Sequence, residues 1–570
     1  MPFMPSKNSR LIDDTLLILT MAVLAGCGLI YEYLLSHYAG RVLGVMESTI
    51  YTMIGLMIVS MGLGAFAARK VRCAFNGFVY LELLIAFLGA SAILIIGGLI
   101  AITQILPHII ADMFALPPDM LPKGGVFKQL SFIAINSPYF FGVILGFFIG
   151  MEIPLIARIR EEIHGQHLAN NLGTIYGADY IGAGIGAAIW VVFLLSIDIS
   201  KAAALTASLN LIAGAFFILR YWHKLTWRKT FISLHLVLAL LILLMFNYGN
   251  HWLNQMNSLL YLDKVVHVQK TNYQQLTFTE RYLGVSDNEQ QTSIINFYLN
   301  GRLQFSSIDE HIYHDYLVAP VLAGSARHDN ILIIGGGDGL ALRDVLKYAP
   351  KKVTLIDLDS ELINIFKTPD EHVNANLARK ISYMNKNSLQ DKRVTILRSD
   401  AFLTVNKLLK AGQVFDAIIV DLPDPSHPDL NKLYTVNFYA KLKQLLSGDG
   451  LIAIQSTSPY HAKDSFISIG KTLRAANFAH VQQYHDNVPS FGEWGWTIAS
   501  KRGKSPLARL NNLKQLPVKH SWLNINILKS AFIFPNDFYI NEASIDINIL
   551  GSHTLYQLHQ NAWQTQQGIN

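Results

Sequence analysis

Long apolar runs dominate the first 250 residues of this 570-residue chain, and the last of them ends near Phe246. A helix needs about 20 apolar residues to cross a bilayer, and an isolated segment can cross it only as a helix. Seven runs reach this length: residues 15–37, 49–68, 79–104, 131–156, 178–197, 201–220 and 230–248. We therefore predict an all-α, multi-pass transmembrane domain over residues 1–250, with the lipid bilayer as its partner.

Four acidic side chains lie within or beside these runs: Glu32, Glu82, Glu152 and Asp179. A carboxylate is costly to bury inside a bilayer, and many such groups have a function. These acids could bind a cation on a transport path. The alternative is that they lie near helix ends, reach the interface or pair with a neighbouring helix.

A glycine-rich stretch in the second half has the pattern of a nucleotide-binding loop. Residues 331–334 are four consecutive apolar residues, which is typical of a strand buried on both faces of a parallel sheet. Glycines follow at 335, 336, 337 and 339, and apolar residues then resume at helical spacing. Strand, glycine loop and helix form the unit that binds a nucleoside-like ligand at the carboxyl edge of a sheet.

Asp338 within this loop indicates the charge of the ligand. In a partly dry site, a carboxylate would repel a pyrophosphate by an energy on the order of several kcal/mol. It suits a cationic ligand, such as a sulfonium or an amine. The alternative is a surface Asp that accepts hydrogen bonds from the amides at the start of the helix.

Three further predicted strands each end in an acidic residue: 353–356 before Asp357, 394–397 before Asp400, and 415–420 before Asp421. Ligands bind outside the carboxyl ends of parallel strands, so these acids and Asp338 are expected to line one cleft. Asp357 stands about 20 residues after the glycine loop, where an acid can accept hydrogen bonds from both ribose hydroxyls. Asp400 could accept an adenine amino group.

A series of motifs runs through the second half of the chain. They are Tyr273-Gln274, Leu299-Asn300-Gly301 with Gln304, Asp309-Glu310, Tyr313-His314-Asp315, Gly335-Gly336-Gly337-Asp338-Gly339 with Leu342-Arg343, Asp357-Leu358-Asp359, Asp400-Ala401, Asp421 with Asp424-Pro425, and Pro428. In this order and spacing, the region from about 265 to 500 resembles the spermidine synthase (polyamine aminopropyltransferase) family. The apolar first half resembles the multi-pass membrane subgroup of that family.

The resemblance implies a role for each matching position. Decarboxylated S-adenosylmethionine, the co-substrate, would be held by Gln274, Gly335, Gly337, Asp357, Asp400, Ala401 and Pro428. The acceptor amine would be held by Gln304, Tyr313, His314, Asp338 and the segment Asp421-Leu422-Pro423-Asp424. Asp421 would be the catalytic proton acceptor.

The implied reaction transfers an aminopropyl group to putrescine and gives spermidine and methylthioadenosine. An amine attacks the carbon next to a sulfonium, so the protein must position the reactants and keep the amine unprotonated. The pKa of a primary amine is about 10, and a carboxylate beside the attacking nitrogen can accept its proton. Asp338 would repel the carboxylate of intact S-adenosylmethionine and attract the free amine of the decarboxylated form.

Three departures from the family pattern leave the acceptor amine open. Leu422 and Pro423 stand where the family usually has two small hydroxyl residues, and Asp357 replaces the more common Glu. Phe491 stands where a Tyr often lines the amine pocket, and Glu493 could compensate for the missing hydroxyl.

The resemblance and the local patterns together divide the chain into four parts. After the transmembrane domain, residues 263–305 alternate polar and apolar side chains around short turns, which predicts a small antiparallel sheet within a β-domain of residues 251–325. Residues 326–505 are expected to form a Rossmann-like α/β domain of the S-adenosylmethionine-methyltransferase type. Residues 506–570 are a C-terminal extension without a readable motif.

Composition limits the other classes of partner. Basic and aromatic residues do not interleave in one segment, so no nucleic acid is expected, and much of the net charge of +6 lies in loops between apolar runs. We expect no metal, because Cys27 and Cys73 lack metal-ligand spacing and no other ligand cluster is visible. Soluble members of the resembled family are commonly dimers or tetramers, which implies a homo-oligomer.

Two other functions stay open: a methyltransferase that uses intact S-adenosylmethionine on the same fold, and a polyamine transporter or sensor whose second half only binds the amine. Sidedness is also open. The basic loops place the amino terminus in the cytoplasm, and seven spans then place the second half outside. A cytosolic co-substrate requires a cytoplasmic catalytic domain at the cell (inner) membrane. The two expectations for the second half agree if residues 105–128 contain a further span, or if the basic loops do not report the orientation.

Overall fold

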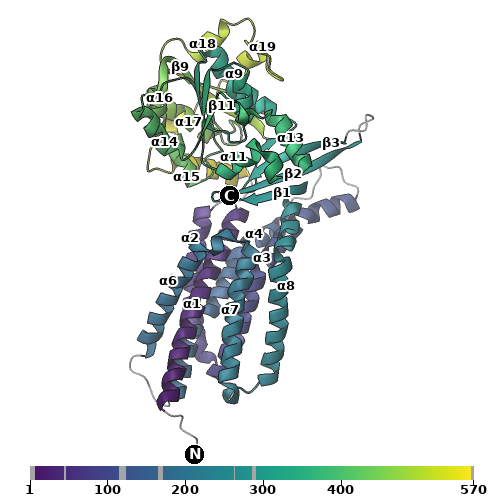
Figure 1. Cartoon of the computed structure of the whole chain (residues 1–570), viewed down its shortest axis with the longest axis vertical. Coiled ribbons are helices and arrows are strands. Elements are labelled where there is room, and N and C mark those ends of the chain that lie inside the picture. The colour runs from purple at the N-terminus through teal and green to yellow at the C-terminus, as the bar shows by residue number, and fades with distance from the viewer. Residues whose placement is uncertain are drawn as a thin grey trace, which may run out of the picture. The chain divides into compact units, whose positions relative to one another are not determined.

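The computed structural model describes residues 7–43, 46–114, 124–164, 171–261, 263–285 and 291–566 (Figure 1). The chain divides into two compact units, Met1–Asp263 and Lys264–Asn570. The helices of the first unit are α1 (Lys7–Leu43), α2 (Met46–Ala67), α3 (Ala74–Met113), α4 (Val126–Ile149), α5 (Glu152–His164), α6 (Asn171–Val192), α7 (Ile199–Arg220) and α8 (Arg228–Leu260).

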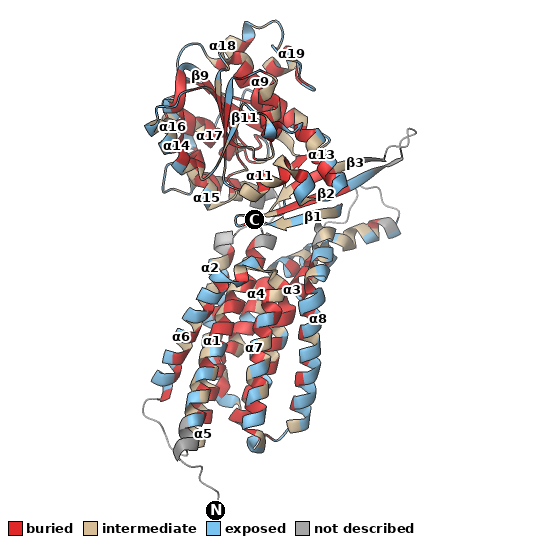
Figure 2. Ribbon diagram, in the orientation of Figure 1, coloured by how far each residue is buried: buried red, intermediate tan, exposed pale blue. Residues whose placement is uncertain are grey.

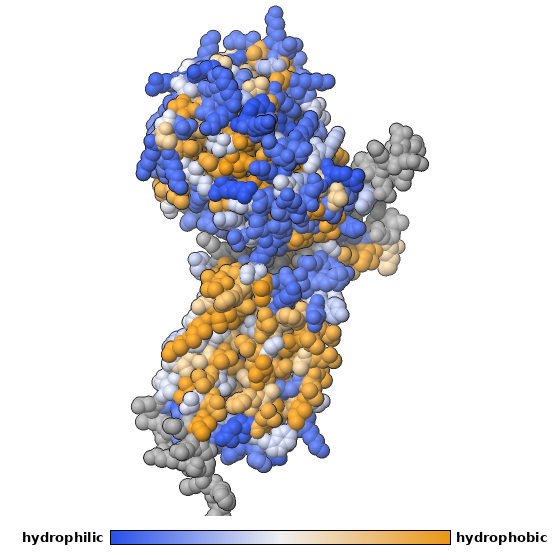
Figure 3. Space-filling view, viewed as in Figure 1, coloured by the Kyte–Doolittle hydropathy of each residue, from blue (hydrophilic) through white to orange (hydrophobic). Residues whose placement is uncertain are grey.

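Seven helical segments of the first unit are long and apolar enough to cross a membrane. They coincide with the seven predicted apolar runs, and α4 and α5 together form one of them. Residues 105–113 continue α3, and the rest of the suggested further span includes residues outside the described ranges. Large apolar side chains face outward on this unit, including Phe66 at 72% exposure, and Figure 3 shows a largely hydrophobic surface there. Such a surface is consistent with contact to lipid.

Small residues bring α1 and α6 into close contact. A side chain on Gly182 would collide with the carbonyl of Ala22, and one on Gly186 would collide with Gly26. Glycine at both positions therefore lets the two backbones approach, as in many membrane helix pairs.

Many residues on the inner sides of these helices are buried, and many on their outer sides are exposed (Figure 2). Three of the four acids of the apolar runs are among the buried residues. Glu32, Glu82 and Glu152 are buried, and Glu82 Oε2 accepts a 3.0 Å hydrogen bond from Asn210 of α7. The hydroxyl of Tyr31 donates in turn to Asn210. Among the described residues, Glu82 Oε1 and Glu152 Oε2 have no hydrogen-bond partner.

The second unit begins with the predicted small antiparallel sheet. Its four strands pair in the order β1-β2-β3-β4. Their bounds are Lys264–Lys270, Gln275–Val285, Gln291–Leu299 and Arg302–Ser306. Phe278, Phe297 and Phe305 pack with Phe366 on one face of this sheet.

A seven-stranded sheet follows in the order β10-β11-β9-β8-β5-β6-β7. The strands are β5 (Asn330–Gly335), β6 (Lys352–Asp357), β7 (Val394–Arg398), β8 (Phe415–Asp421), β9 (Leu446–Gln455), β10 (His480–Val488) and β11 (Gly492–Ser500). The first five are parallel to one another, and β11 runs antiparallel to β9. At the edge, β10 pairs antiparallel with β11 and therefore runs in the same direction as the first five. The predicted Rossmann-like fold is confirmed by this order.

Helices cover both faces of the sheet (Figure 1). They are α9 (Glu310–Gly324), α10 (Leu340–Leu346), α11 (Ser360–Lys367), α12 (Pro369–His372), α13 (Ala375–Asn385), α14 (Ala401–Lys410), α15 (Pro428–Asn431), α16 (Val436–Leu445), α17 (Lys463–Ala475), α18 (Pro506–Asn511), α19 (Ile525–Ser530) and α20 (Thr554–Gln566). Alternate residues of β5 enter different cores. Ile331 and Ile333 pack with α9 and α10, while Leu332 and Ile334 pack with α14 and α16. This double burial explains the continuous apolar run.

Candidate functional site

The glycine loop lies between β5 and β8, where the strand order reverses. Gly335 has φ +82°, and any side chain on it would collide with the carbonyl oxygen of Asp421. The amide of Gly336 donates a 3.1 Å hydrogen bond to the same carbonyl. Glycine is therefore required both for the backbone conformation and for the close approach of the two strand ends. Ligands of open α/β sheets bind at such a reversal point.

Three predicted site residues come together at this point. His314, Asp338 and Asp421 each offer a nitrogen or oxygen atom within 4.8 Å of the other two. The Tyr313 hydroxyl donates a 2.8 Å hydrogen bond to Asp421 Oδ1, and His314 Nε2 lies 3.9 Å from Asp421 Oδ2. The sequence showed no cluster of metal-ligating type, whereas the fold brings this one together. Its two carboxylates can bind a cationic group.

A buried network of ion pairs contacts the Nδ1 side of the His314 ring. Its Nδ1 lies 2.9 Å from Glu310 Oε2, and Arg343 contacts Glu310 Oε1 at 2.7 Å. Burial alone would lower the pKa of His314, but the hydrogen bond and charge of Glu310, with smaller contributions from Asp421 and Asp338, raise it to about 9. The imidazole is therefore a cation at neutral pH and partly balances the two acids.

The pKa values of the two acids of the cluster are raised as well. Burial and the charge of Asp421 raise the pKa of Asp338 to about 7, and His314 opposes the rise. Burial also raises the pKa of Asp421, against the effects of His314 and Tyr313. Asp338 Oδ1 additionally accepts the amide of Leu340 at 2.9 Å, so it caps α10 as well as facing the cluster.

Asp357 lies at the end of β6, beside the glycine loop. Its two oxygens accept hydrogen bonds from the amides of Gly337 at 3.0 Å and Asp359 at 2.9 Å. Burial raises the pKa of Asp357 to about 6, and these two amides oppose the rise. Gln274 joins this group through its 3.0 Å hydrogen bond to Asp359 Oδ2. The position of these side chains agrees with a predicted role in binding the co-substrate, which stays a prediction.

Asp400 is engaged by protein groups on both oxygens. Oδ1 accepts the amide of Phe402 at 2.7 Å and caps α14, which starts at Ala401, and Oδ2 contacts Lys432 at 2.7 Å. Burial would raise the pKa of Asp400, but Lys432 and the backbone amide lower it. The predicted adenine contact would have to share this carboxylate with both partners. Pro428 begins α15.

The segment after Asp421 is fixed by three contacts. Leu422 is buried, and the carbonyl of Pro423 accepts a 2.9 Å hydrogen bond from Tyr434. Asp424 Oδ1 accepts a 2.9 Å hydrogen bond from Gln455, which ends β9. Asp424 Oδ2 lies 3.3 Å from Nε2 of His559, in the C-terminal extension.

Two predicted contributors are not joined to the cluster by any contact in the described part of the chain. The amide of Gln304 bonds to the carbonyls of Arg302 and Leu303 on its own strand. Glu493 pairs with His485 of β10, and a role for Glu493 in place of the missing hydroxyl at Phe491 stays a prediction.

Two contributors were missed by the sequence reasoning. Gln455 follows the buried strand residues 451–454, so the position of a polar residue at a strand end was a usable signal. No comparable sequence signal marked His559, because it belongs to a helix without a motif.

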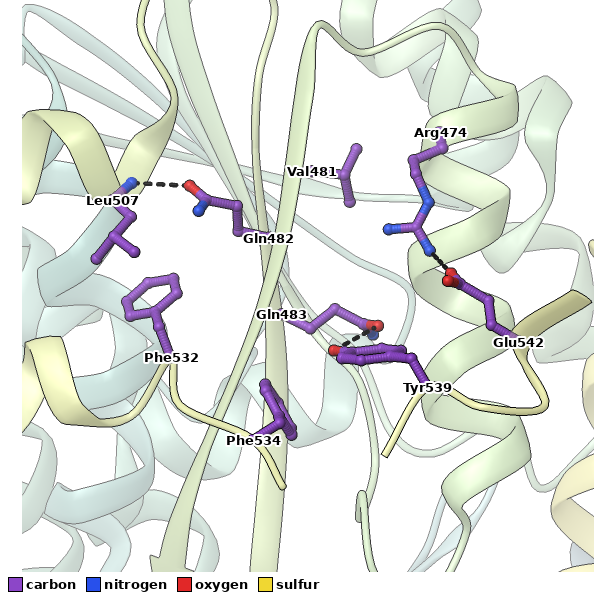
Figure 4. Close-up of a pocket in the computed structure, with 9 residues that line it drawn as sticks. All are labelled: Arg474, Val481, Gln482, Gln483, Leu507, Phe532, Phe534, Tyr539 and Glu542. Atoms are coloured by element: carbon purple, nitrogen blue, oxygen red, sulfur yellow. Dashed lines mark hydrogen bonds and ion pairs between the residues drawn. The ribbon is translucent and has the colours of Figure 1, made fainter. Parts of the chain in front are cut away.

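A separate pocket of about 360 Å³ lies between β10 and the extension, where Arg474 pairs with Glu542 and Tyr539 contacts Gln483 (Figure 4). None of its nine lining residues belongs to the cluster.

The reversal point, the glycine loop and the cluster of His314, Asp338 and Asp421 define a Rossmann-like enzyme with a candidate ligand site at the carboxyl edge of its sheet. Comparison with known proteins agrees with this class. The spermine/spermidine synthase domain matches residues 310–512. A polyamine aminopropyltransferase of Shewanella oneidensis is 57% identical over 567 residues, which cover 99% of this chain and 98% of the relative.

A more distant relative is also named as a polyamine aminopropyltransferase. Polyamine aminopropyltransferase 1 of Streptomyces coelicolor is 30% identical over 92% of this chain and 90% of its own. The crystal structure of spermidine synthase from Thermotoga maritima aligns with 50% of this chain and 88% of its own, at 23% identity and a TM-score of 0.40. The chain belongs to the polyamine aminopropyltransferase family. The predicted family and the predicted enzyme class are thereby confirmed.

Proposed function

We propose that this enzyme transfers the aminopropyl group of decarboxylated S-adenosylmethionine to putrescine, giving spermidine and methylthioadenosine, while its first unit spans the cell membrane. The observation that carries the proposal is the convergence of His314, Asp338 and Asp421 at the reversal point of the sheet. This convergence occurs in a chain 57% identical to a polyamine aminopropyltransferase. The four acids Asp338, Asp357, Asp400 and Asp421 lie at the carboxyl ends of β5, β6, β7 and β8, or within three residues after them.

The reaction requires a base that accepts a proton and side chains that bind positively charged groups. The lone pair of the amine attacks the carbon next to the sulfonium, the carbon–sulfur bond breaks, and methylthioadenosine leaves with the bonding electrons. The attacking nitrogen gives up a proton, and Asp421 is the acceptor. Its buried position favours the neutral acid, which makes proton uptake easier than for an exposed carboxylate. Asp338 attracts the free amine of the decarboxylated donor and also the positive charge of the arriving diamine, and Asp424 is available for the other end of the acceptor.

The test is turnover by the purified full-length chain. Decarboxylated S-adenosylmethionine and putrescine are supplied together, and spermidine and methylthioadenosine are measured by mass spectrometry. We expect both products in equal amounts. Absence of methylthioadenosine with putrescine and with a panel of other diamines would reject the proposal. Competition between the two donor forms separates the methyltransferase alternative, because that enzyme would bind the intact form more tightly.

A second candidate function is cation binding by the first unit. It is favoured by Glu82 and Glu152, which are fully or almost fully buried and each keep an oxygen without a hydrogen-bond partner among the described residues. Isolated carboxylates at such positions are commonly functional. Uptake of labelled putrescine or spermidine by vesicles containing the purified chain tests it, with Glu82→Gln and Glu152→Gln compared against the unchanged chain. Equal uptake by all three proteins would reject this candidate.

A further inference from the structure

The C-terminal extension reaches the proposed amine site through α20. Nε2 of His559 lies 3.3 Å from Oδ2 of Asp424, and the histidine side chain is only 1% exposed. This helix lies outside residues 310–512, which match the family domain. The contact therefore joins the acidic segment after β8 to a part of the chain beyond the recognised domain.

Buried hydrogen bonds fix the extension against the segment that follows Asp424. Asn548 is fully buried, and its amide donates to the carbonyls of Asn431 at 3.1 Å and Tyr434 at 3.2 Å. The amide of Tyr556 donates to Asn431 Oδ1 at 3.3 Å. Leu555, beside it, enters the core below the sheet. These contacts hold α20 in one position, so the approach of His559 to Asp424 is built into the fold.

The arrangement leaves Asp424 oriented by two donors from distant elements. Gln455 donates to Oδ1 at 2.9 Å, and His559 approaches Oδ2. Arg302 of β4 lies within electrostatic range of the same carboxylate. The intervening residues Leu422 and Pro423 carry no side-chain hydroxyl that could do this locally. The carboxyl group of Asp424 is 17% exposed, is held on both oxygens and lies within electrostatic range of Tyr313.

We propose that α20 forms one wall of the acceptor subsite, and that His559 orients Asp424 to receive the ammonium group of an aliphatic diamine that does not react. This inference rests on the proposed function. His559 is a positioning residue, because it acts through Asp424 and not on the reacting atoms. A carboxylate in a fixed place selects the length of the diamine, since the second nitrogen must reach Asp421 while the first is held.

The test compares His559→Ala, His559→Gln and Gln557→Ala in the full-length chain. Gln557 is an exposed residue of the same helix and serves as the control. For His559→Ala we expect the KM for the acceptor diamine to rise about tenfold, in line with one lost hydrogen bond to a charged group. The KM for the donor should stay within about twofold. His559→Gln keeps an N–H donor near the Nε2 position and should restore most of the loss, and Gln557→Ala should behave as the unchanged chain.

A second measurement separates positioning from a general loss of structure. Rates are compared for diamines of three, four and five carbons, and we expect the preference of the unchanged chain to weaken in His559→Ala. An unaltered length preference together with equal changes in both KM values would overturn the inference. If His559→Ala does not fold, the two KM values and the length preference are compared for His559→Gln and Asp424→Asn instead. If the proposed function itself is wrong, the unchanged chain will turn over none of the diamines. This result is distinct from failure of the inference about His559.

Discussion

Tyr313 and His314, two consecutive residues of α9, contact different oxygens of one carboxylate, that of Asp421 at the end of β8. The hydroxyl of Tyr313 donates to Oδ1 at 2.8 Å, and Nε2 of His314 lies 3.9 Å from Oδ2. One contact is a neutral hydrogen bond and the other is an approach by a cation. Together they fix the plane of the carboxylate and limit how far its pKa rises on burial.

Tyr313→Phe removes the hydrogen bond to Asp421 without changing the size of the ring. The bond lowers the pKa of Asp421, so its loss should raise that pKa and move the acid limb of the kcat profile to higher pH. At neutral pH we expect kcat to fall by about 3- to 10-fold, in line with a net hydrogen bond of about 1 kcal/mol. Tyr439→Phe is the matched control, because this buried hydroxyl has no partner among the described residues. An identical pH profile in Tyr313→Phe would contradict the assignment.

Asp421→Asn keeps the shape of the site and removes the proton acceptor. We expect kcat to fall by about 10²- to 10⁴-fold, the usual contribution of a positioned base. Binding of the decarboxylated donor, measured by calorimetry, should change little. Asp429→Asn is the control, since this side chain lies in the same segment and is 88% exposed. Retention of most of the turnover in Asp421→Asn would remove Asp421 from the base role.

The strands of the second unit could be predicted because burial on both faces leaves a continuous apolar run. The run at 331–334 and the acid after each later strand are local signals, and the structure places them as expected. The meeting of Asp338 with Asp421 depends on β8 lying beside β5. Local pattern cannot give that neighbour relation. The expectation of one cleft came from the general rule that parallel strands bind ligands at their carboxyl ends.

The contacts that sequence reasoning missed span long distances along the chain. Asp424 and His559 are 135 positions apart, and α20 shows no motif that would connect them. In the first unit, the apolar run 79–104 became the longer helix Ala74–Met113. Hydropathy indicates which residues can contact lipid. Backbone hydrogen bonding continues until the chain turns, so a helix can be longer than its apolar run.

Gly335→Ala should destabilise the second unit. The position has φ +82°, and an added Cβ would collide with the carbonyl oxygen of Asp421, which cannot move without disturbing β8. We expect a loss of about 2–4 kcal/mol, seen as a lower Tm of the full-length chain in detergent. Gly448→Ala is the control, because a Cβ there meets nothing within 4 Å in the described part of the chain. Equal Tm values for the two variants would show that the close approach is not needed.

Seven membrane crossings would place the loop before α3 and the second unit on opposite sides of the membrane. Cys73 is exposed in that loop, whereas Cys27 is buried. A membrane-impermeant maleimide is applied to intact cells carrying the unchanged chain, and to cells carrying the double variant Cys73→Ser, Tyr383→Cys. Tyr383 is 85% exposed in α13. We expect one of the two chains to be labelled in intact cells, and both after permeabilisation. Labelling of both or neither in intact cells would rule out an odd number of crossings.

Asp338 should control the response of acceptor binding to pH. Burial and the nearby charge of Asp421 raise its pKa to about 7, so the group is neutral below that pH and negative above it. An ammonium group is attracted only by the ionised form, and the kcat/KM for the diamine should therefore fall as the pH drops through about 7. In Asp338→Asn the side chain cannot ionise, so kcat/KM should be lower by about 10-fold or more at pH 8. The fall of kcat/KM on the acid side of the pH profile, its acid limb, should disappear in this variant.

The control for that experiment is Asp429→Asn, which should keep the limb because its exposed carboxylate lies outside the cluster. His314 carries a raised pKa of about 9, so it stays positive across the window from pH 6 to 8 and does not itself produce the change. The measurement is the initial rate at low diamine and saturating donor over this window. If Asp338→Asn retains the same acid limb as the unchanged chain, the titrating group is another member of the cluster, and Asp338 does not hold the amine.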